Sequence, residues 1–102
     1  MCFVTDLVDG LARLMSSDPD VTLVNFGSED PLKMVAVAKK IIEMTNSRSQ
    51  IVFENPLLFL TKRGTPDLKR AKEELGWLPL IRLEEGLRLA IDYTIANKEA
   101  LV

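Results

Sequence analysis

The 102-residue sequence contains no histidine and one cysteine, Cys2, and these absences exclude most metal and nucleophile chemistry. Without histidine there is no imidazole base or imidazole metal ligand, and one cysteine forms neither a thiolate zinc cluster nor an internal disulfide. No histidine is present to activate the Cys2 thiol. A lone cysteine is typical of a reducing compartment, so we predict a cytoplasmic protein with no metal site and no catalytic residue of its own.

Glycine-rich loops and long apolar runs are also missing. The five glycines are scattered singly, so there is no phosphate loop and no dinucleotide-binding fingerprint. No apolar run is long enough to span a bilayer, and Asp6 and Asp9 interrupt the amino-terminal apolar stretch where a signal peptide would lie. The net charge of −2 offers no broad basic surface. We therefore expect no bound cofactor, no membrane contact and no nucleic-acid partner.

Apolar periodicity predicts a mixed α/β (α+β) architecture. Runs rich in β-branched and aromatic residues indicate strands, whereas three- and four-residue spacings indicate helices. A strand, a four-turn helix and a second strand predict a parallel crossover. We predict one domain over residues 1–102, with about four helices and a small parallel sheet of two to three strands. The strands are expected at 2–4, 21–26 and 50–54, and the helices at 6–16, 31–46, 67–76 and 83–98.

Residues 62–86 are the most distinctive stretch. Lys62 and Arg63 precede a Pro-Asp pair, a short amphipathic helix and a Gly-Trp-Leu-Pro stop. Arginine presents a forked, permanent positive charge that suits a diphosphate, and Lys62 can add charge. A solvated helix face is an equally good interpretation of the basic residues. Asp67 can serve either as a ligand contact or as the cap of the helix that follows, and the cap is favoured.

Five motifs in order resemble the carboxyl-terminal part of the extended short-chain dehydrogenase/reductase family of nucleotide-sugar epimerases, dehydratases and decarboxylases. The motif set is similar to that of UDP-glucuronate decarboxylases or dTDP-glucose 4,6-dehydratases. The motifs are Phe3-Val4-Thr5-Asp6-Leu7-Val8-Asp9-Gly10-Leu11, Asn25-Phe26-Gly27, the helix expected at 31–46, Pro66-Asp67 with Ala71-Lys72 and Leu75-Gly76-Trp77-Leu78-Pro79, and Leu83-Glu84-Glu85-Gly86-Leu87 with Ile91-Asp92-Tyr93.

The resemblance implies a substrate-binding portion that is not catalytic alone. In that family the Rossmann half binds NAD and supplies a Tyr-x-x-x-Lys pair, and both precede this region, so the chain is expected to be a fragment. The resemblance assigns Arg63, with Lys62, to the nucleotide diphosphate of a UDP- or dTDP-sugar, and Asp67 to the same site. Arg63 precedes Asp67 by four residues, whereas many members place the arginine three residues before the aspartate.

The alternative is a small non-catalytic module that binds other proteins. The apolar run at 57–60 must meet a core, a partner or a ligand, and burial against protein is favoured. In a fragment, helices that normally pack on the missing half keep an uncovered apolar face. We therefore also expect self-association through helix 6–16 or helix 83–98.

Overall fold

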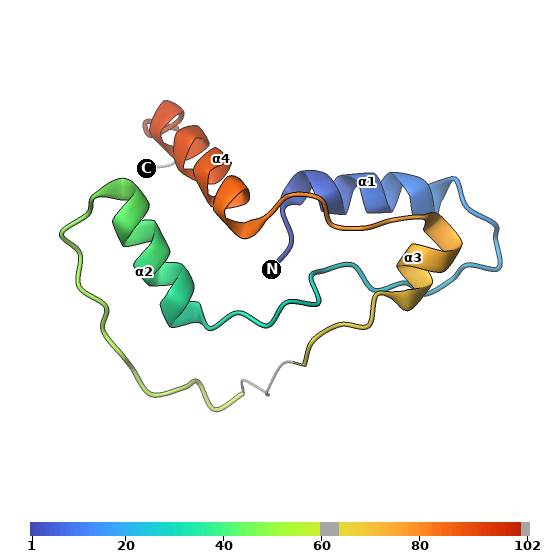
Figure 1. Cartoon of the computed structure of the whole chain (residues 1–102), viewed down its shortest axis with the longest axis horizontal. Helices are drawn as coiled ribbons and strands as arrows, with labels where there is room; N and C mark the ends of the chain where they lie inside the picture. Colours follow the sequence, from blue (N-terminus) through green and yellow to red (C-terminus); the bar gives the residue numbers. More distant parts are fainter. Residues whose placement is uncertain (60–63, 101–102) are drawn as a thin grey trace. The chain divides into compact units, whose positions relative to one another are not determined.

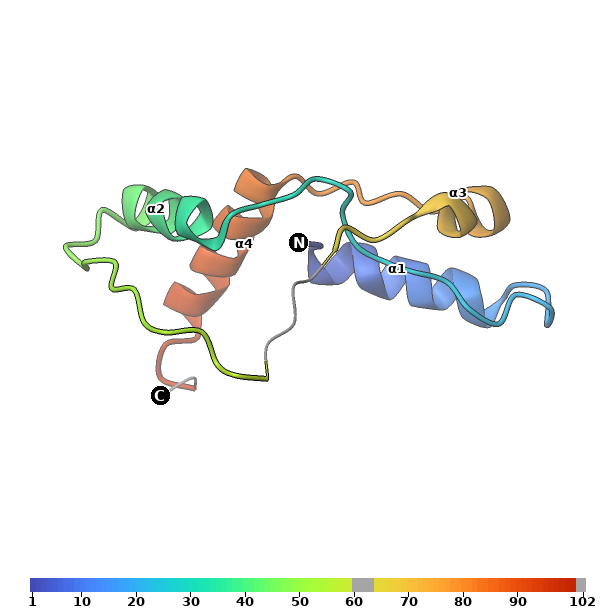
Figure 2. The same ribbon diagram turned by 90° about the horizontal axis from the view of Figure 1, so that it is seen from below.

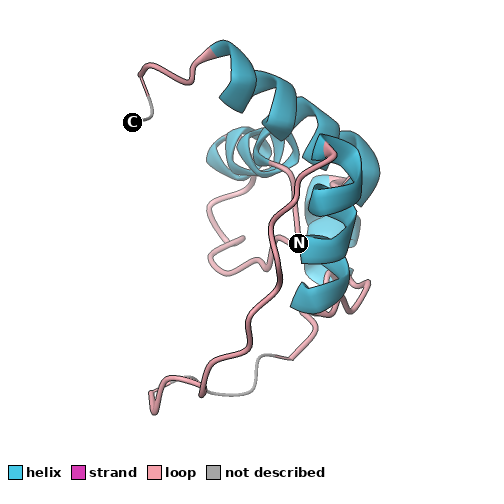
Figure 3. Cartoon of the chain, turned by 90° about the vertical axis from the view of Figure 1, so that its left-hand side faces the viewer, coloured by secondary structure: helices cyan, strands magenta, loops and turns pink. Residues whose placement is uncertain are grey.

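The computed structural model describes residues 1–59 and 64–100, and within these ranges the secondary structure is entirely helical (Figure 3). The expected parallel sheet is therefore wrong, because none of the three predicted strands is found in the described part of the chain. The helix count of four is confirmed there. The helices are α1 (Val4–Met15), α2 (Met34–Thr45), α3 (Lys69–Leu75) and α4 (Leu83–Ala96), as labelled in Figure 1.

The segment 21–26 explains the error. Its side chains behave as an apolar run should, since Val24 and Phe26 pack against the core. A strand also needs a neighbouring backbone to pair with, and β-propensity reports only the fit to a half-buried surface. The backbone of Val21 instead bonds locally, its amide donating to the carbonyl of Asp18 at 2.9 Å. Along 50–54, Val52 and Phe53 are exposed, so that run lacks even the burial of a strand.

The chain divides into two compact units. The first comprises Met1–Pro31 and Thr65–Val102, and the second comprises Leu32–Gly64. The first unit contains α1, α3 and α4, and the second contains α2. The expectation that residues 1–102 act as one domain stays a prediction.

In the first unit, the connection between α3 and α4 runs antiparallel to α1 (Figures 1 and 2). Its beginning is fixed near the end of α1, where the Arg13 guanidinium donates to the carbonyls of Leu75 and Gly76 at 3.2 and 3.0 Å. Its end is fixed near the start of α1, where the amide of Ile81 donates to the Asp6 carboxylate at 2.9 Å. Backbone groups of the connection are thus satisfied by side chains of α1 instead of by a neighbouring strand.

Trp77 lies at the centre of the small core that these contacts enclose. It is fully buried with Leu68 and Ala71, and its indole N–H donates to the carbonyl of Asp6 at 2.7 Å. Its ring meets Phe26 edge-on, with centroids 4.9 Å apart. The expected anchoring role of Trp77 is confirmed, but it packs beside α1 and α3, not between α3 and α4. The core is smaller than a chain of this length can build.

Helix starts differ more from expectation than helix ends. The helix predicted at 31–46 begins only at Met34, so Asp30 and Pro31 lie ahead of its first turn. Its end is set by Asn46, which adopts a left-handed conformation with φ 51°. α3 ends in the same way at Gly76, with φ 60°, which confirms the expected glycine cap.

Large apolar side chains remain on the surface. Leu57, Leu58 and Phe59 are exposed, so the burial expected for the run 57–60 is wrong for these three, and Leu60 lies outside the described residues. Within the described ranges, no helix combines the length and apolar character needed to cross a membrane.

Candidate functional site

The structure describes only part of the predicted diphosphate site. Lys62 and Arg63 lie outside the described residues, whereas Asp67 lies inside them. An oxygen of the Asp67 carboxylate accepts a hydrogen bond from the amide of Lys69, the first residue of α3, at 2.9 Å. Asp67 thus satisfies one of the free amides at the start of α3, but it does so from one residue ahead of the cap position, which Leu68 occupies.

The Pro66–Asp67 pair is held by the Asn25-Phe26-Gly27 segment. The Asn25 side-chain amide donates to the carbonyl of Asp67 at 3.2 Å. Gly27 lies so close to Pro66 that a Cβ atom built on the glycine would stand 2.9 Å from Pro66 Cγ. Two of the sequence motifs are therefore one structural unit, and the fixed backbone begins three residues after Arg63.

A salt bridge adds a contact between α3 and the residues that follow the Asn25-Phe26-Gly27 segment. Lys72 Nζ lies 2.7 Å from a carboxylate oxygen of Glu29. The hydrogen bond from Lys72 lowers the pKa of the Glu29 carboxyl group. Both side chains are solvent-exposed, so this pair aligns the two segments and adds little stability.

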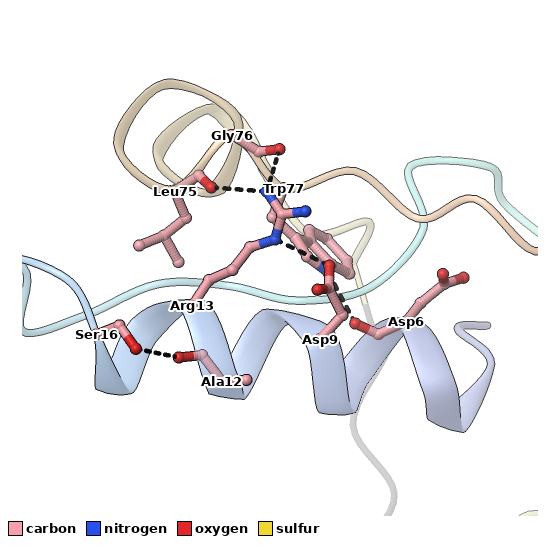
Figure 4. Close-up of polar contacts among 8 residues, drawn as sticks. All are labelled: Asp6, Asp9, Ala12, Arg13, Ser16, Leu75, Gly76 and Trp77. Carbon is pink, nitrogen blue, oxygen red and sulfur yellow. Dashed lines mark hydrogen bonds and ion pairs between the residues drawn. The ribbon is translucent and has the colours of Figure 1, made fainter.

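Sequence reasoning missed the pairing of α1 with residues 75–81. Figure 4 shows Arg13 reaching from α1 to the Leu75 and Gly76 carbonyls while also pairing with Asp9. The Asp6 carboxylate is buried and occupied by the Ile81 amide. In the sequence, Asp6 and Asp9 were interpreted only as charges that interrupt an apolar stretch. No local pattern predicts that the side chains of Asp6 and Arg13 bind backbone groups more than 60 residues away.

A second candidate site is an apolar cavity of about 140 Å³ between the amino terminus and α4. Cys2, Phe3, Ile81 and Leu87 contribute to its lining, and Arg82 is its one formally charged side chain. Its size suits a small apolar group, not a nucleotide diphosphate.

The chemistry of Cys2 at this cavity is that of a protonated thiol. Burial, followed by the nearby Asp6 carboxylate, raises its pKa above the ordinary thiol value. Because the thiolate is the nucleophile, iodoacetamide should alkylate Cys2 more slowly in the folded chain than in the urea-unfolded chain at the same pH. The pH midpoint of the alkylation rate should also be higher when the chain is folded. Mass spectrometry of timed samples measures both, and identical folded and unfolded profiles would contradict this assignment.

The described residues provide no fit for a metal ion or a dinucleotide. No group of three or more His, Cys, Asp or Glu side chains comes together in residues 1–59 and 64–100. Four of the glycines already have packing or capping roles: Gly10 meets Phe26 and Trp77, Gly27 meets Pro66, Gly86 meets Phe3, and Gly76 ends α3. The fifth, Gly64, has no neighbour within 4 Å of its Cβ position. Among the described residues, these glycines therefore form no cradle for a pyrophosphate.

Curated relatives align with most of the chain. UDP-glucuronic acid decarboxylase 5 of Arabidopsis thaliana is 39% identical over 88 residues, which are 86% of this chain and 26% of the plant protein. UDP-glucuronic acid decarboxylase 1 of Xenopus tropicalis is 37% identical over 91 residues, 89% of this chain and 21% of the frog protein. The zebrafish (Danio rerio) protein of the same name is 38% identical over 91 residues, 89% of this chain and 22% of that protein. No protein-family profile matches the chain.

These matches confirm the resemblance to the carboxyl-terminal portion of extended short-chain dehydrogenases/reductases. Over most of its length the chain is similar to part of the UDP-glucuronic acid decarboxylases, one of the two enzyme groups that its motifs resemble. The chain spans about a quarter of the length of the curated relatives that it matches.

Proposed function

We propose that the chain is the nucleotide-sugar-binding portion of an NAD-dependent decarboxylase that acts on a UDP-sugar, and that it is not catalytic alone. The observation that carries the proposal is identity of 35–39% to UDP-glucuronic acid decarboxylases over about nine-tenths of the chain. The motifs present support this division of labour, because they resemble those of the substrate side of the family. We also propose that the protein is cytoplasmic.

Arg63 carries the ligand contact in this proposal, and Lys62 adds positive charge to it. Asp67, Asn25 and Pro66 hold the backbone that follows the two basic residues. The Asp67 carboxylate has one oxygen engaged by the Lys69 amide, which leaves the other oxygen as the acceptor for a hydroxyl of the nucleotide sugar. Arg63 therefore supplies affinity, and Asp67 combines a structural role with a weaker ligand contact.

Binding of UDP to the isolated chain and its variants tests the assignment of Arg63. Arg63→Ala should weaken UDP binding by about 10- to 100-fold, because a charge-assisted hydrogen bond is worth roughly 1.5–3 kcal/mol. Arg63→Lys should recover part of the loss, since it keeps the charge but not the fork. Chemical-shift titration by NMR measures weak affinities of this kind.

The matched control for this titration is Arg48→Ala, which removes an equal charge outside residues 62–86. It should leave UDP affinity unchanged. Equal affinities of the unaltered chain and Arg63→Ala would remove Arg63 from the site. A chimera in which this chain replaces the homologous segment of a full-length decarboxylase tests the wider proposal. Failure of the folded chimera to bind UDP would overturn it.

A second candidate function is a non-catalytic protein-interaction module, and one observation favours it. α1 presents five large apolar side chains to solvent. Such a face is typical of a helix that another molecule covers.

A further inference from the structure

The apolar cavity beside the start of α4 has two walls. Leu83, Leu87 and Ala90 form one of them, because their three- and four-residue spacing places them on the same side of α4. Phe3 contributes to the other, and its ring packs so close to Gly86 that a Cβ atom there would stand 3.0 Å from Phe3 Cδ2. The missing side chain at position 86 therefore lets Phe3 approach α4 and line the cavity.

The volume of the cavity limits what it can hold. It measures about 140 Å³, and an apolar protein cavity of roughly 150 Å³ admits one benzene molecule. A bound water needs two to four polar partners, which an apolar lining does not supply. The cavity therefore suits one apolar group the size of a benzene ring or a short branched alkyl chain.

Arg82 adds a positive charge at the mouth of the cavity. Its side chain is exposed, and no acidic side chain in the described part of the chain pairs with it. The Asp6 carboxylate is engaged by the Ile81 amide, whereas Glu84 and Glu85 lie in the first turn of α4 and do not line the cavity. The guanidinium is thus available to an anion, and its planar fork matches the two oxygens of a carboxylate.

We propose that this cavity binds a small monocarboxylate, with the apolar body inside and the carboxylate on Arg82. The lining selects an apolar body of limited size, and the charge selects an acid over a neutral compound of the same shape. A neutral compound would fill the same volume but leave the guanidinium to water. The cavity shares no residue with the diphosphate contact proposed at Arg63, so it is a second and separate site.

Titration of the 102-residue chain with sodium benzoate, followed by NMR, tests this assignment. We expect saturable shifts of the backbone amides of residues 1–3 and 81–90, with a dissociation constant on the order of 1 mM, because the ligand has only about nine non-hydrogen atoms. Benzyl alcohol has the same ring without the charge, so it should bind about three- to tenfold more weakly, the contribution of a partly exposed ion pair. Acetate has the charge without the ring and should not saturate.

Alkylation of Cys2 gives a second readout that does not depend on chemical shifts. The thiol lines the cavity, so bound benzoate should slow its reaction with iodoacetamide, whereas acetate at the same concentration should not. Sodium chloride should weaken benzoate binding, because Arg82 is exposed and its charge is screened by salt.

Arg82→Gln is the decisive variant, and Arg88→Gln is its matched control. Arg88 is an exposed arginine of the same helix that does not line the cavity. Arg82→Gln should lower the affinity for benzoate to that for benzyl alcohol, and Arg88→Gln should leave it unchanged. Ala90→Phe should fill the cavity and abolish binding of both compounds, with circular dichroism to show that the helices are retained.

Three results would overturn the proposal. The first is the absence of saturable shifts with benzoate. The second is an Arg82→Gln chain that binds benzoate as tightly as the unaltered chain. The third is equal affinity for benzoate and benzyl alcohol, which would instead indicate a purely apolar occupant, such as a side chain of another protein. None of these results bears on UDP binding, so the proposed function is tested separately.

Discussion

Replacing Trp77 with alanine is expected to unfold the first unit. The side chain is fully buried, and truncation of a buried tryptophan costs about 3–5 kcal/mol. The change also removes the indole donor to the Asp6 carbonyl and the edge-on contact with Phe26. Because a domain with so few buried side chains has a total stability near the low end of about 5 kcal/mol, this loss equals most of it. Urea titration followed by circular dichroism measures the effect.

Two other substitutions separate the causes. Trp77→Phe keeps an aromatic ring but leaves the Asp6 carbonyl without its indole donor, so a loss of about 1–3 kcal/mol is expected. Tyr93→Ala removes an exposed aromatic side chain and should change stability by less than about 0.5 kcal/mol. If Trp77→Ala unfolds at the same urea concentration as Tyr93→Ala, Trp77 is not the anchor of the core.

Gly10→Ala is expected to destabilise the chain although alanine is the better helix former. In α1 the substitution should gain about 1 kcal/mol from helix propensity. The new Cβ would stand 2.6 Å from Phe26 Cε1 and 3.0 Å from Trp77 Nε1, which is closer than atoms pack. Moving these rings costs about 1–3 kcal/mol. Because this cost is expected to exceed the gain from helix propensity, the free energy of unfolding should fall. Thermal and urea unfolding both report it.

The control for Gly10 is the reverse change at an exposed position of the same helix. Ala12→Gly should lose about 1 kcal/mol through propensity alone. Destabilisation by both substitutions would show that contact with Phe26 and Trp77, not propensity, decides the residue at position 10. A more stable Gly10→Ala chain would mean that α1 does not approach these two rings.

The helices could be predicted because their signals are local. Three- and four-residue spacing located all four, and Gly76 marked the end of α3 correctly. Helix starts were less predictable. At the start of α2, Asp30 and Pro31 form a good capping pair, yet the backbone is still extended at Lys33, just before Met34. Several nearby residues can satisfy the free amides of a first turn, so one favourable pair does not fix the boundary.

The sheet could not be predicted because a strand depends on a second segment. Val24 and Phe26 show that the apolar character of 21–26 predicted burial correctly. The backbone of that segment has no strand beside it among the described residues, and periodicity carries no information about pairing.

The sequence predicted which motifs form the candidate site, but not how their residues contact one another. Pro66, Asp67 and the Asn25 segment were each identified in the sequence, but their contact with one another required the fold. The roles of Asp6 and Arg13 were missed because each binds main-chain atoms, which every residue has. Two side chains that bind each other can be recognised in a sequence by their complementary residue types. A side chain that binds backbone has no such partner type, because its partner can be any residue.

The pairing of α1 with residues 75–81 also sets the order of events during synthesis. The bonds from Trp77 and Ile81 to Asp6 join positions 71 and 75 residues apart. α1 leaves the ribosome before residues 75–81, so its polar side has no partner until residue 81 has emerged, at a synthesis rate of about 5–20 residues per second. The core around Trp77 therefore closes only after residue 81 has been made, however early α1 was synthesised.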